Sequence, residues 1–217
     1  MKKIIIVDLG TGNLRSVSKA VAYTCPDDYI VTTAEPSEIL GADYLILPGQ
    51  GAIGTWFRQL NSDPELNSAV VNRLRQGPVL GICLGLQTLF EYSEENQGTQ
   101  GLGFLKGRVK HFSNSEFHQS INGRRYKIPH MGWNKISIIN DHPLWKDIES
   151  DERFYFVHSY YADSDNNSEI AAECNYGNTF TAAAFYQNIF ATQFHPEKSQ
   201  RSGLKLLKNF TNWNGII

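Results

Sequence analysis

The sequence is short of several features that would place it in a specialised class of protein. Its 217 residues include only three cysteines, Cys25, Cys83 and Cys174. So few cysteines exclude a disulfide framework and fit a reducing compartment. Basic and acidic residues nearly balance, 20 against 22, and the net charge of −2 gives no electrostatic reason to expect a nucleic-acid partner.

Long apolar runs are also missing. The run Ile4–Val7 ends at Asp8, which is too short for the core of a signal peptide. No stretch approaches the roughly 20 apolar residues that span a bilayer, so we expect a cytoplasmic protein without a membrane partner. Hydrophobic residues make up 41% of the chain, enough for a sizeable core, and we expect one domain over residues 1–217.

Short apolar strands alternate with helices in the first hundred residues. The expected strands are Ile4–Val7, Tyr29–Thr33, Tyr44–Leu47 and Val79–Cys83, and the expected helices are Leu14–Ala22, Leu66–Leu74 and Leu84–Tyr92. This alternation predicts an α/β fold with an open, mostly parallel sheet flanked by helices. In such sheets, sites form at the carboxyl ends of the strands.

After about residue 100 the expected strands follow one another through turns rather than long helices. They are Gly107–Phe112, Lys135–Ile139, Phe154–His158, Thr181–Phe185 and Ile189–Gln193. We therefore expect a mixed or antiparallel extension of the same sheet, closed by an amphipathic helix over Ser202–Phe210. The polar stretch Ser113–Lys127 predicts a loop or a small hairpin with its turn at Asn122-Gly123.

The strongest local motif is Gly81-Ile82-Cys83-Leu84-Gly85-Leu86-Gln87. It has the pattern of a nucleophile elbow, in which a strand turns sharply into a helix and side chains two residues either side of the nucleophile would collide. An isolated cysteine is more often an inert core residue, but this frame favours a nucleophile. At a helix N-terminus, the helix dipole and free N–H groups would stabilise a thiolate.

A thiol nucleophile needs a base, and His195 is the candidate. It follows an expected strand, and Glu197 stands two residues later across the stiff Pro196, close enough to fold back onto the imidazole. The alternative is a surface turn with an incidental histidine and glutamate. The rival bases are His111, His118, His130, His142 and His158.

An oxyanion hole has two expected sources. One is the backbone N–H of Leu84, directly after the nucleophile, and the other is the loop Pro48-Gly49-Gln50-Gly51 at a neighbouring strand end. Read alone, that loop is a common strand-to-helix turn. No pair of cysteines or histidines has metal-ligand spacing, and the loop Gly10–Asn13 has no Walker lysine, so we expect neither a metal nor a cofactor.

These motifs together resemble the class I, triad-type glutamine amidotransferases. Within that family the chain looks most like the glutaminase subunits of imidazole glycerol phosphate synthase, over nearly its whole length. The motifs that carry the resemblance are V-D-x-G-x-G-N at 7–13, L-P-G-x-G at 47–51, G-I-C-L-G-L-Q at 81–87, G-L-G-F-L-K-G-R-V at 101–109, P-H-M-G-W-N at 129–134, F-V-H-S-Y at 156–160 and F-H-P-E-K at 194–198.

The resemblance implies that Cys83 attacks the side-chain amide of glutamine, while His195 transfers protons and Glu197 orients His195. It also implies ammonia delivery to a (β/α)₈-barrel synthase subunit that makes imidazole glycerol phosphate and AICAR in histidine biosynthesis. The remaining implied roles are the oxyanion backbone at Leu84, Gln50 and Gly51, glutamine binding at Gly49, Gln87, Ser159 and Tyr160, and a partner interface or ammonia gate at Asn13, Trp133, Tyr155 and Lys198.

One position departs from the family pattern. Gln50 stands where the family usually has valine in L-P-G-V-G. This departure leaves room for a paralogous glutaminase that serves a sugar amidotransferase in surface-polysaccharide synthesis. Two further alternatives are a catalytically silent α/β interaction module, which would lack part of the triad, and a cysteine peptidase, which would need neither Gln87 nor a partner.

Overall fold

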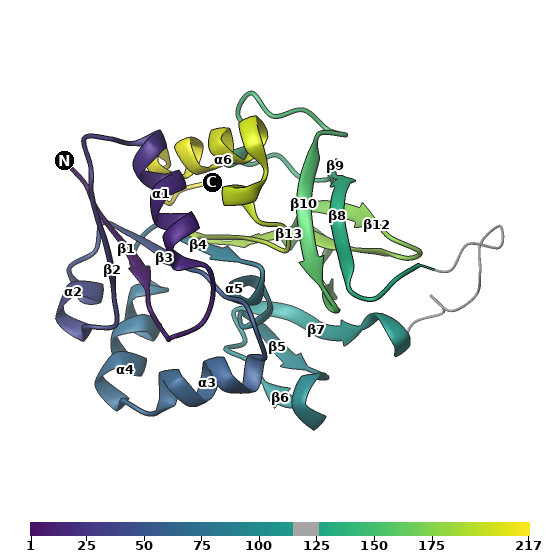
Figure 1. Cartoon of the computed structure of the whole chain (residues 1–217), viewed down its shortest axis with the longest axis horizontal. Coiled ribbons are helices and arrows are strands. Elements are labelled where there is room, and N and C mark those ends of the chain that lie inside the picture. The colour runs from purple at the N-terminus through teal and green to yellow at the C-terminus, as the bar shows by residue number, and fades with distance from the viewer. Residues whose placement is uncertain (115–125) are drawn as a thin grey trace.

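The computed structural model describes residues 1–114 and 126–217 (Figure 1). Twelve strands of these residues form one mixed sheet, whose main order is β2-β1-β3-β4-β14-β13-β11-β7-β5-β6; β12 pairs with β13 and β9 with β12. The strands of this sheet are β1 (Lys3–Val7), β2 (Tyr29–Thr33), β3 (Tyr44–Leu47), β4 (Val79–Ile82), β5 (Phe90–Ser93), β6 (Thr99–Gln100), β7 (Leu105–His111), β9 (Ser137–Ile138), β11 (Tyr160–Ser164), β12 (Ile170–Asn175), β13 (Thr179–Tyr186) and β14 (Ile189–Thr192).

The sheet has a parallel part and a largely antiparallel part. Strands β2, β1, β3, β4 and β14 pair in parallel, and β14, β13, β11 and β7 pair antiparallel. The expected fold class, an α/β sheet with an antiparallel extension in the C-terminal half, is therefore confirmed. A separate antiparallel sheet contains β8 (His130–Lys135) and β10 (Arg153–His158).

Helices cover both faces of the sheet. Figure 1 shows α1 and α6 on one face and α2, α3 and α4 on the other. The α-helices are α1 (Leu14–Thr24), α2 (Pro36–Leu40), α3 (Ile53–Asn61), α4 (Pro64–Arg73), α5 (Leu84–Gln87) and α6 (Gln200–Asn212). Short 3₁₀ turns are η1 (Glu95–Gln97), η2 (Phe112–Asn114), η5 (Pro143–Trp145), η6 (Asn167–Glu169) and η7 (Pro196–Lys198). None of the helices in the described ranges is long and apolar enough to cross a bilayer.

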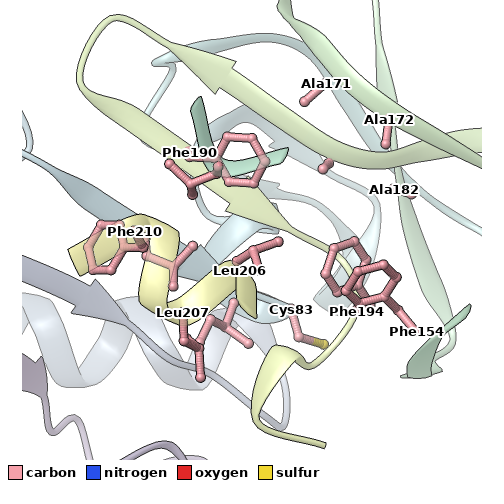
Figure 2. Packing of buried hydrophobic residues seen from close by; sticks show 14 of the residues in the cluster. Cys83, Phe154, Ala171, Ala172, Ala182, Phe190, Phe194, Leu206, Leu207 and Phe210 are labelled. Atoms are coloured by element: carbon pink, nitrogen blue, oxygen red, sulfur yellow. The ribbon is translucent and has the colours of Figure 1, made fainter. Parts of the chain in front are cut away.

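The β1 sequence shows why two core layers form. Successive side chains of a strand point to opposite faces, so Ile4 and Ile6 join the layer beneath α1 and α6, and Ile5 and Val7 join the layer beneath α2–α4. In Figure 2, the α6 side chains pack over the sheet, and Cys83 lies at the edge of this layer. A continuous apolar run such as Ile4–Val7 of β1 is therefore stable in a sheet only when helices cover both faces.

The expected helix Leu84–Tyr92 is wrong beyond its first turn. Helix α5 ends at Gln87, and Phe90–Ser93 forms β5, which pairs in parallel with β7. The aromatic residues Phe90 and Tyr92 favour a strand, and the pairing with β7 satisfies the backbone there. The apolar residues of this segment are buried because other parts of the protein pack on both sides of it, and they do not form one face of a long helix.

Other differences lie in the C-terminal half. The expected strand Phe154–His158 forms, but in the small sheet with β8 rather than in the main sheet. The expected strand Lys135–Ile139 falls on the junction between β8 and β9. Several elements were not expected from the sequence: α2, α3, β6, β8, β11 and β12. The expected hairpin turn Asn122-Gly123 lies outside the described residues.

Candidate active site

The elbow at Cys83 is a strained turn held by glycines. Cys83 has φ 54° and ψ −101°, a conformation that non-glycine residues rarely adopt. A Cβ on Gly85 would stand 2.0 Å from the Leu47 carbonyl oxygen, and one on Gly81 would stand 3.0 Å from the Gly85 carbonyl. The turn therefore closes only with glycine at both positions, which confirms the physical basis of the expected elbow.

Strand pairing brings the candidate base to the candidate nucleophile. Strands β4 and β14 are parallel neighbours, with Ile82 beside Thr192, so both chains leave the sheet at the same edge. The Cys83 N–H donates to the Thr192 carbonyl at 2.7 Å. The backbone N–H of His195 donates to the Tyr155 carbonyl at 2.9 Å. This hydrogen bond ties the candidate base, which follows β14 of the main sheet, to β10 of the small sheet.

His195 and Glu197 form a buried pair. The Nδ1 of His195 lies 2.8 Å from Oε1 of Glu197, and the two side chains are 2% and 1% exposed. Burial opposes the imidazolium, but Cys83 and Glu197 overcome it and raise the pKa of His195 to about 10. The Nε2 of His195 has no hydrogen-bond partner within residues 1–114 and 126–217, so it is available for proton transfer.

The source of positive charge differs from the expected one. Helix α5 is a single turn, so only a few aligned peptide dipoles add up at its N-terminus and the helix dipole predicted at Cys83 is small. The nearby positive charge is the imidazolium of His195, whose pKa is raised. The elbow contributes backbone geometry rather than a long helix.

Cys83 opens into a pocket of about 450 Å³. Its lining includes most of the predicted oxyanion and glutamine-binding residues, namely Gln50, Gly51, Leu84, Gln87, Ser159 and Tyr160. Gly49 is not part of that lining and packs against Leu84, where a Cβ would come within 2.6 Å of the Leu84 Cβ. Gly49 therefore brings its loop against the elbow.

The polar groups around Tyr160 are already engaged within the protein. The Nε2 of Gln87 donates to the Tyr160 carbonyl at 2.9 Å and to Oε1 of Gln193 at 3.2 Å. The Ser159 carbonyl accepts from the N–H of Phe112 at 3.1 Å. This wall of the pocket is therefore preorganised by internal hydrogen bonds.

Glu95 and Gln193 were not expected at this site, and His158 was expected only as a rival base. Glu95 and His158 line the pocket, and Gln193 contacts the sulfur of Cys83. Glu95 follows β5, a segment whose sequence predicts a helix, so no strand-end signal marked it. Burial raises the pKa of Glu95, and its Oε2 accepts the N–H of Ile53 at 2.9 Å.

The residues predicted to face a partner fall into two groups. Trp133 of β8 is 42% exposed, its ring centroid lies 6.2 Å from that of Tyr155, and Lys198 Nζ lies 5.6 Å from the Tyr155 ring centroid. Tyr155 and Lys198 also line the pocket of Cys83. Asn13 instead caps α1, where its Oδ1 accepts the N–H of Ser16 at 3.2 Å.

The rival histidines occupy different environments. Burial lowers the pKa of His130 and of His142 to about 4 and that of His158 to about 3. His111 contacts Ser113, and His118 lies outside the described residues. Within the described part of the chain, His195 is the histidine with a carboxylate partner.

Comparison with known proteins agrees with this geometry. The family described as Glutamine amidotransferase class-I matches residues 5–213. The protein named imidazole glycerol phosphate synthase subunit HisH of Thiobacillus denitrificans is 46% identical over 97% of this chain and 91% of its own length. The protein of the same name from Nitrosomonas europaea is 46% identical over 98% of this chain and 99% of its own length.

Solved structures share the fold at low sequence identity. The structure described as PurLQS from Thermotoga maritima has a TM-score of 0.69 at 18% identity and covers 98% of this chain and 99% of its own. The structure of a putative GMP synthase component from Thermoplasma acidophilum has a TM-score of 0.67 at 22% identity and covers 98% of this chain and 93% of its own. The chain belongs to the class I glutamine amidotransferase family.

Proposed function

We propose that this class I glutamine amidotransferase hydrolyses L-glutamine to glutamate and ammonia, as the glutaminase subunit of imidazole glycerol phosphate synthase in histidine biosynthesis. The observation that carries the reaction is the buried His195–Glu197 pair beside Cys83 at one edge of the sheet. The choice of pathway is supported by full-length relatives at 43–46% identity that carry the HisH name. One domain over the whole chain performs this reaction.

The first half of the reaction forms a thioester. His195 carries the proton that has left Cys83, and the Cys83 sulfur attacks the side-chain amide carbon of glutamine. The oxyanion is held by the backbone N–H of Leu84 and by the loop at Gln50 and Gly51. As the carbon–nitrogen bond breaks, His195 gives its proton to the leaving ammonia.

The second half hydrolyses the thioester. His195, now neutral, takes a proton from water, whose oxygen attacks the thioester carbon and releases glutamate and the thiol. Glu197 holds the Nδ1 side of the ring at 2.8 Å throughout, so Nε2 always faces the reacting atoms.

Glutamine carries a charged α-ammonium group that the pocket must recognise. Glu95 is a carboxylate in the lining of the pocket, together with Gln87 and Tyr160, and we assign it to that ammonium. Gln87, Ser159, Tyr160 and Gly49 complete the binding wall. The competing role of Glu95 is structural, because its Oε2 accepts an N–H at the start of α3.

Glu95→Gln separates these two roles, because the amide oxygen still accepts the Ile53 N–H while the charge is lost. We expect KM for glutamine to rise about tenfold or more, with kcat within about threefold, since a charged hydrogen bond is worth roughly 1.5–3 kcal/mol. Steady-state kinetics with glutamine measures this. An unchanged KM in Glu95→Gln would leave Glu95 with the capping role alone.

Ammonia is delivered to a (β/α)₈-barrel subunit that forms imidazole glycerol phosphate and AICAR, in a cytoplasmic heterodimer with lyase activity. The exposed aromatic Trp133, with Tyr155 and Lys198 behind it, supports a docking face beside the pocket. We assign Asn13, which is exposed at the start of α1, to the same partner interface. Tyr155 and Lys198 line both the pocket and this face, which suits an ammonia gate.

The test is reconstitution with purified subunits. Alone, the protein should hydrolyse glutamine slowly; with the barrel partner and its nucleotide substrate the rate should rise on the order of 10²-fold, the effect of aligning a misplaced group. Stimulation by a sugar amidotransferase synthase instead of the histidine-pathway barrel would establish the paralogous alternative. No stimulation by either would contradict the subunit role.

A further inference from the structure

Gln193 is a buried polar side chain against the proposed nucleophile. It is 0% exposed, and its Nε2 lies 3.7 Å from the sulfur of Cys83. Its backbone N–H donates to the Ala182 carbonyl at 2.8 Å, so the residue is fixed at the end of β14. A buried amide at this place is costly unless its hydrogen bonds are made, and the triad alone gives it no role.

The hydrogen bonds leave the Gln193 amide one orientation. The Tyr160 carbonyl can only accept, so Gln87 must turn its NH₂ group towards it, at 2.9 Å. The other hydrogen of that NH₂ group goes to Oε1 of Gln193, at 3.2 Å. With its oxygen fixed by Gln87, Gln193 presents its own NH₂ group to the sulfur of Cys83.

Two neutral histidines hold the same carbonyl, His158 directly and His130 through His158. The Nδ1–H of His158 donates to Tyr160 O at 2.8 Å, so Nε2 of His158 accepts from Nδ1 of His130 at 3.0 Å. The Nε2 of His130 in turn accepts from Asn134 Nδ2 at 3.3 Å. Burial lowers the pKa of His158 to about 3 and that of His130 to about 4, so both rings keep these tautomers at neutral pH. The carbonyl that orients Gln87 is thus held in place.

We propose that Gln193 is a further catalytic residue: it donates an amide N–H to the Cys83 sulfur and stabilises the thiolate in position for attack. A thiolate is a stronger acceptor than a thiol, so this donor favours the reactive form. The imidazolium of His195 provides a positive charge near the sulfur, and the Gln193 N–H provides a directional hydrogen bond to the sulfur. The inference rests on the proposed role of Cys83 as the nucleophile.

The test measures how readily the Cys83 thiolate forms, by iodoacetamide labelling from pH 5 to 9 and mass spectrometry of the Cys83 peptide. Gln193→Met removes the donor at similar volume, and Gln193→Glu keeps the shape but places a carboxylate beside the sulfur. We expect the labelling midpoint to rise by about one pH unit in Gln193→Met and further in Gln193→Glu, because each loses stabilisation of the thiolate. In the complex, kcat for glutamine should fall about tenfold with KM within about threefold.

The controls separate this role from packing. Gln59→Met, on the exposed face of α3, makes the same chemical change away from the site and should match the wild type. Cys174 is an internal reference, because burial raises its pKa to about 12. Urea unfolding and co-elution with the barrel subunit on gel filtration identify the variants that fold; Gln193→Glu is isosteric and should be among them.

An unchanged labelling midpoint in folded Gln193→Met and Gln193→Glu would overturn the proposal and leave Gln193 a packing residue. This readout does not depend on glutamine. A shifted midpoint in a protein that fails to hydrolyse glutamine would therefore support the donor role of Gln193 and contradict the proposed function.

Discussion

Cys83→Ala abolishes glutamine-dependent synthesis by the reconstituted complex while ammonia-dependent synthesis persists. We expect glutamine hydrolysis to fall about 10⁴-fold or more, because the thioester route disappears with the sulfur and the remaining groups offer only binding and oxyanion stabilisation. Synthesis from added ammonia should stay within about twofold, since the barrel subunit performs that step itself. Parallel assays with glutamine and with ammonium chloride measure the two rates.

Cys25→Ala is the matched control, because Cys25 is a half-buried thiol at the C-terminal end of α1, away from the pocket lining. It should keep glutamine hydrolysis within about twofold of the wild type. Glutamine hydrolysis that survives in Cys83→Ala would contradict the assignment of the nucleophile. Failure of Cys83→Ala to co-elute with the barrel subunit would show that the substitution disrupts assembly, and its effect on the chemistry would then be measured in Cys83→Ser.

Gly85→Ala should be among the most destabilising single substitutions in the chain. The added Cβ would stand 2.0 Å from the carbonyl oxygen of Leu47, which belongs to the central strand β3 and cannot yield like a flexible side chain. We expect the free energy of unfolding to fall by about 3–5 kcal/mol, with loss of glutamine hydrolysis in any folded fraction, because the elbow can no longer close. Chemical denaturation measures the change.

Gly41→Ala tests the same substitution at a position where the nearest neighbour can move. A Cβ there meets its nearest atom, the Nζ of Lys3, at 3.3 Å, at the end of a flexible side chain. Its free energy of unfolding should stay within about 1 kcal/mol of the wild type. Equal stability of Gly85→Ala and Gly41→Ala would contradict the close approach of the elbow to β3.

Much of the fold could be predicted from local sequence, and the elements that were predicted wrongly or missed have physical explanations. Strands such as Ile4–Val7 are continuous apolar runs because helices cover both faces, and the bounds of β2 and β3 agree with the expected ones. The helix after Cys83 was overextended, because Leu86, Leu89 and Phe90 have helical spacing although α5 ends at Gln87 and the chain enters β5 at Phe90. Strand β8 was missed, because its large apolar residues, Met131 and Trp133, lie on its exposed face, while the polar His130 is buried.

The sequence by itself predicted the chemistry of the candidate site. The glycines around Cys83 and the two-residue offset from His195 to Glu197 are local patterns, and local sterics and short spacing dictate what they can form. Both patterns could therefore be recognised from the sequence without the tertiary structure.

Only the tertiary structure decided which groups meet. Cys83 and His195 are neighbours because β14 pairs with β4, and Gln193 faces the Cys83 sulfur because of the same pairing. Glu95 reaches the pocket through β5, and His158 reaches it through the small sheet. No local pattern specifies these contacts, because they depend on which strands far apart in the chain lie side by side. The orientation of the buried Gln193 amide likewise depends on its hydrogen bond with Gln87, which comes from another part of the chain.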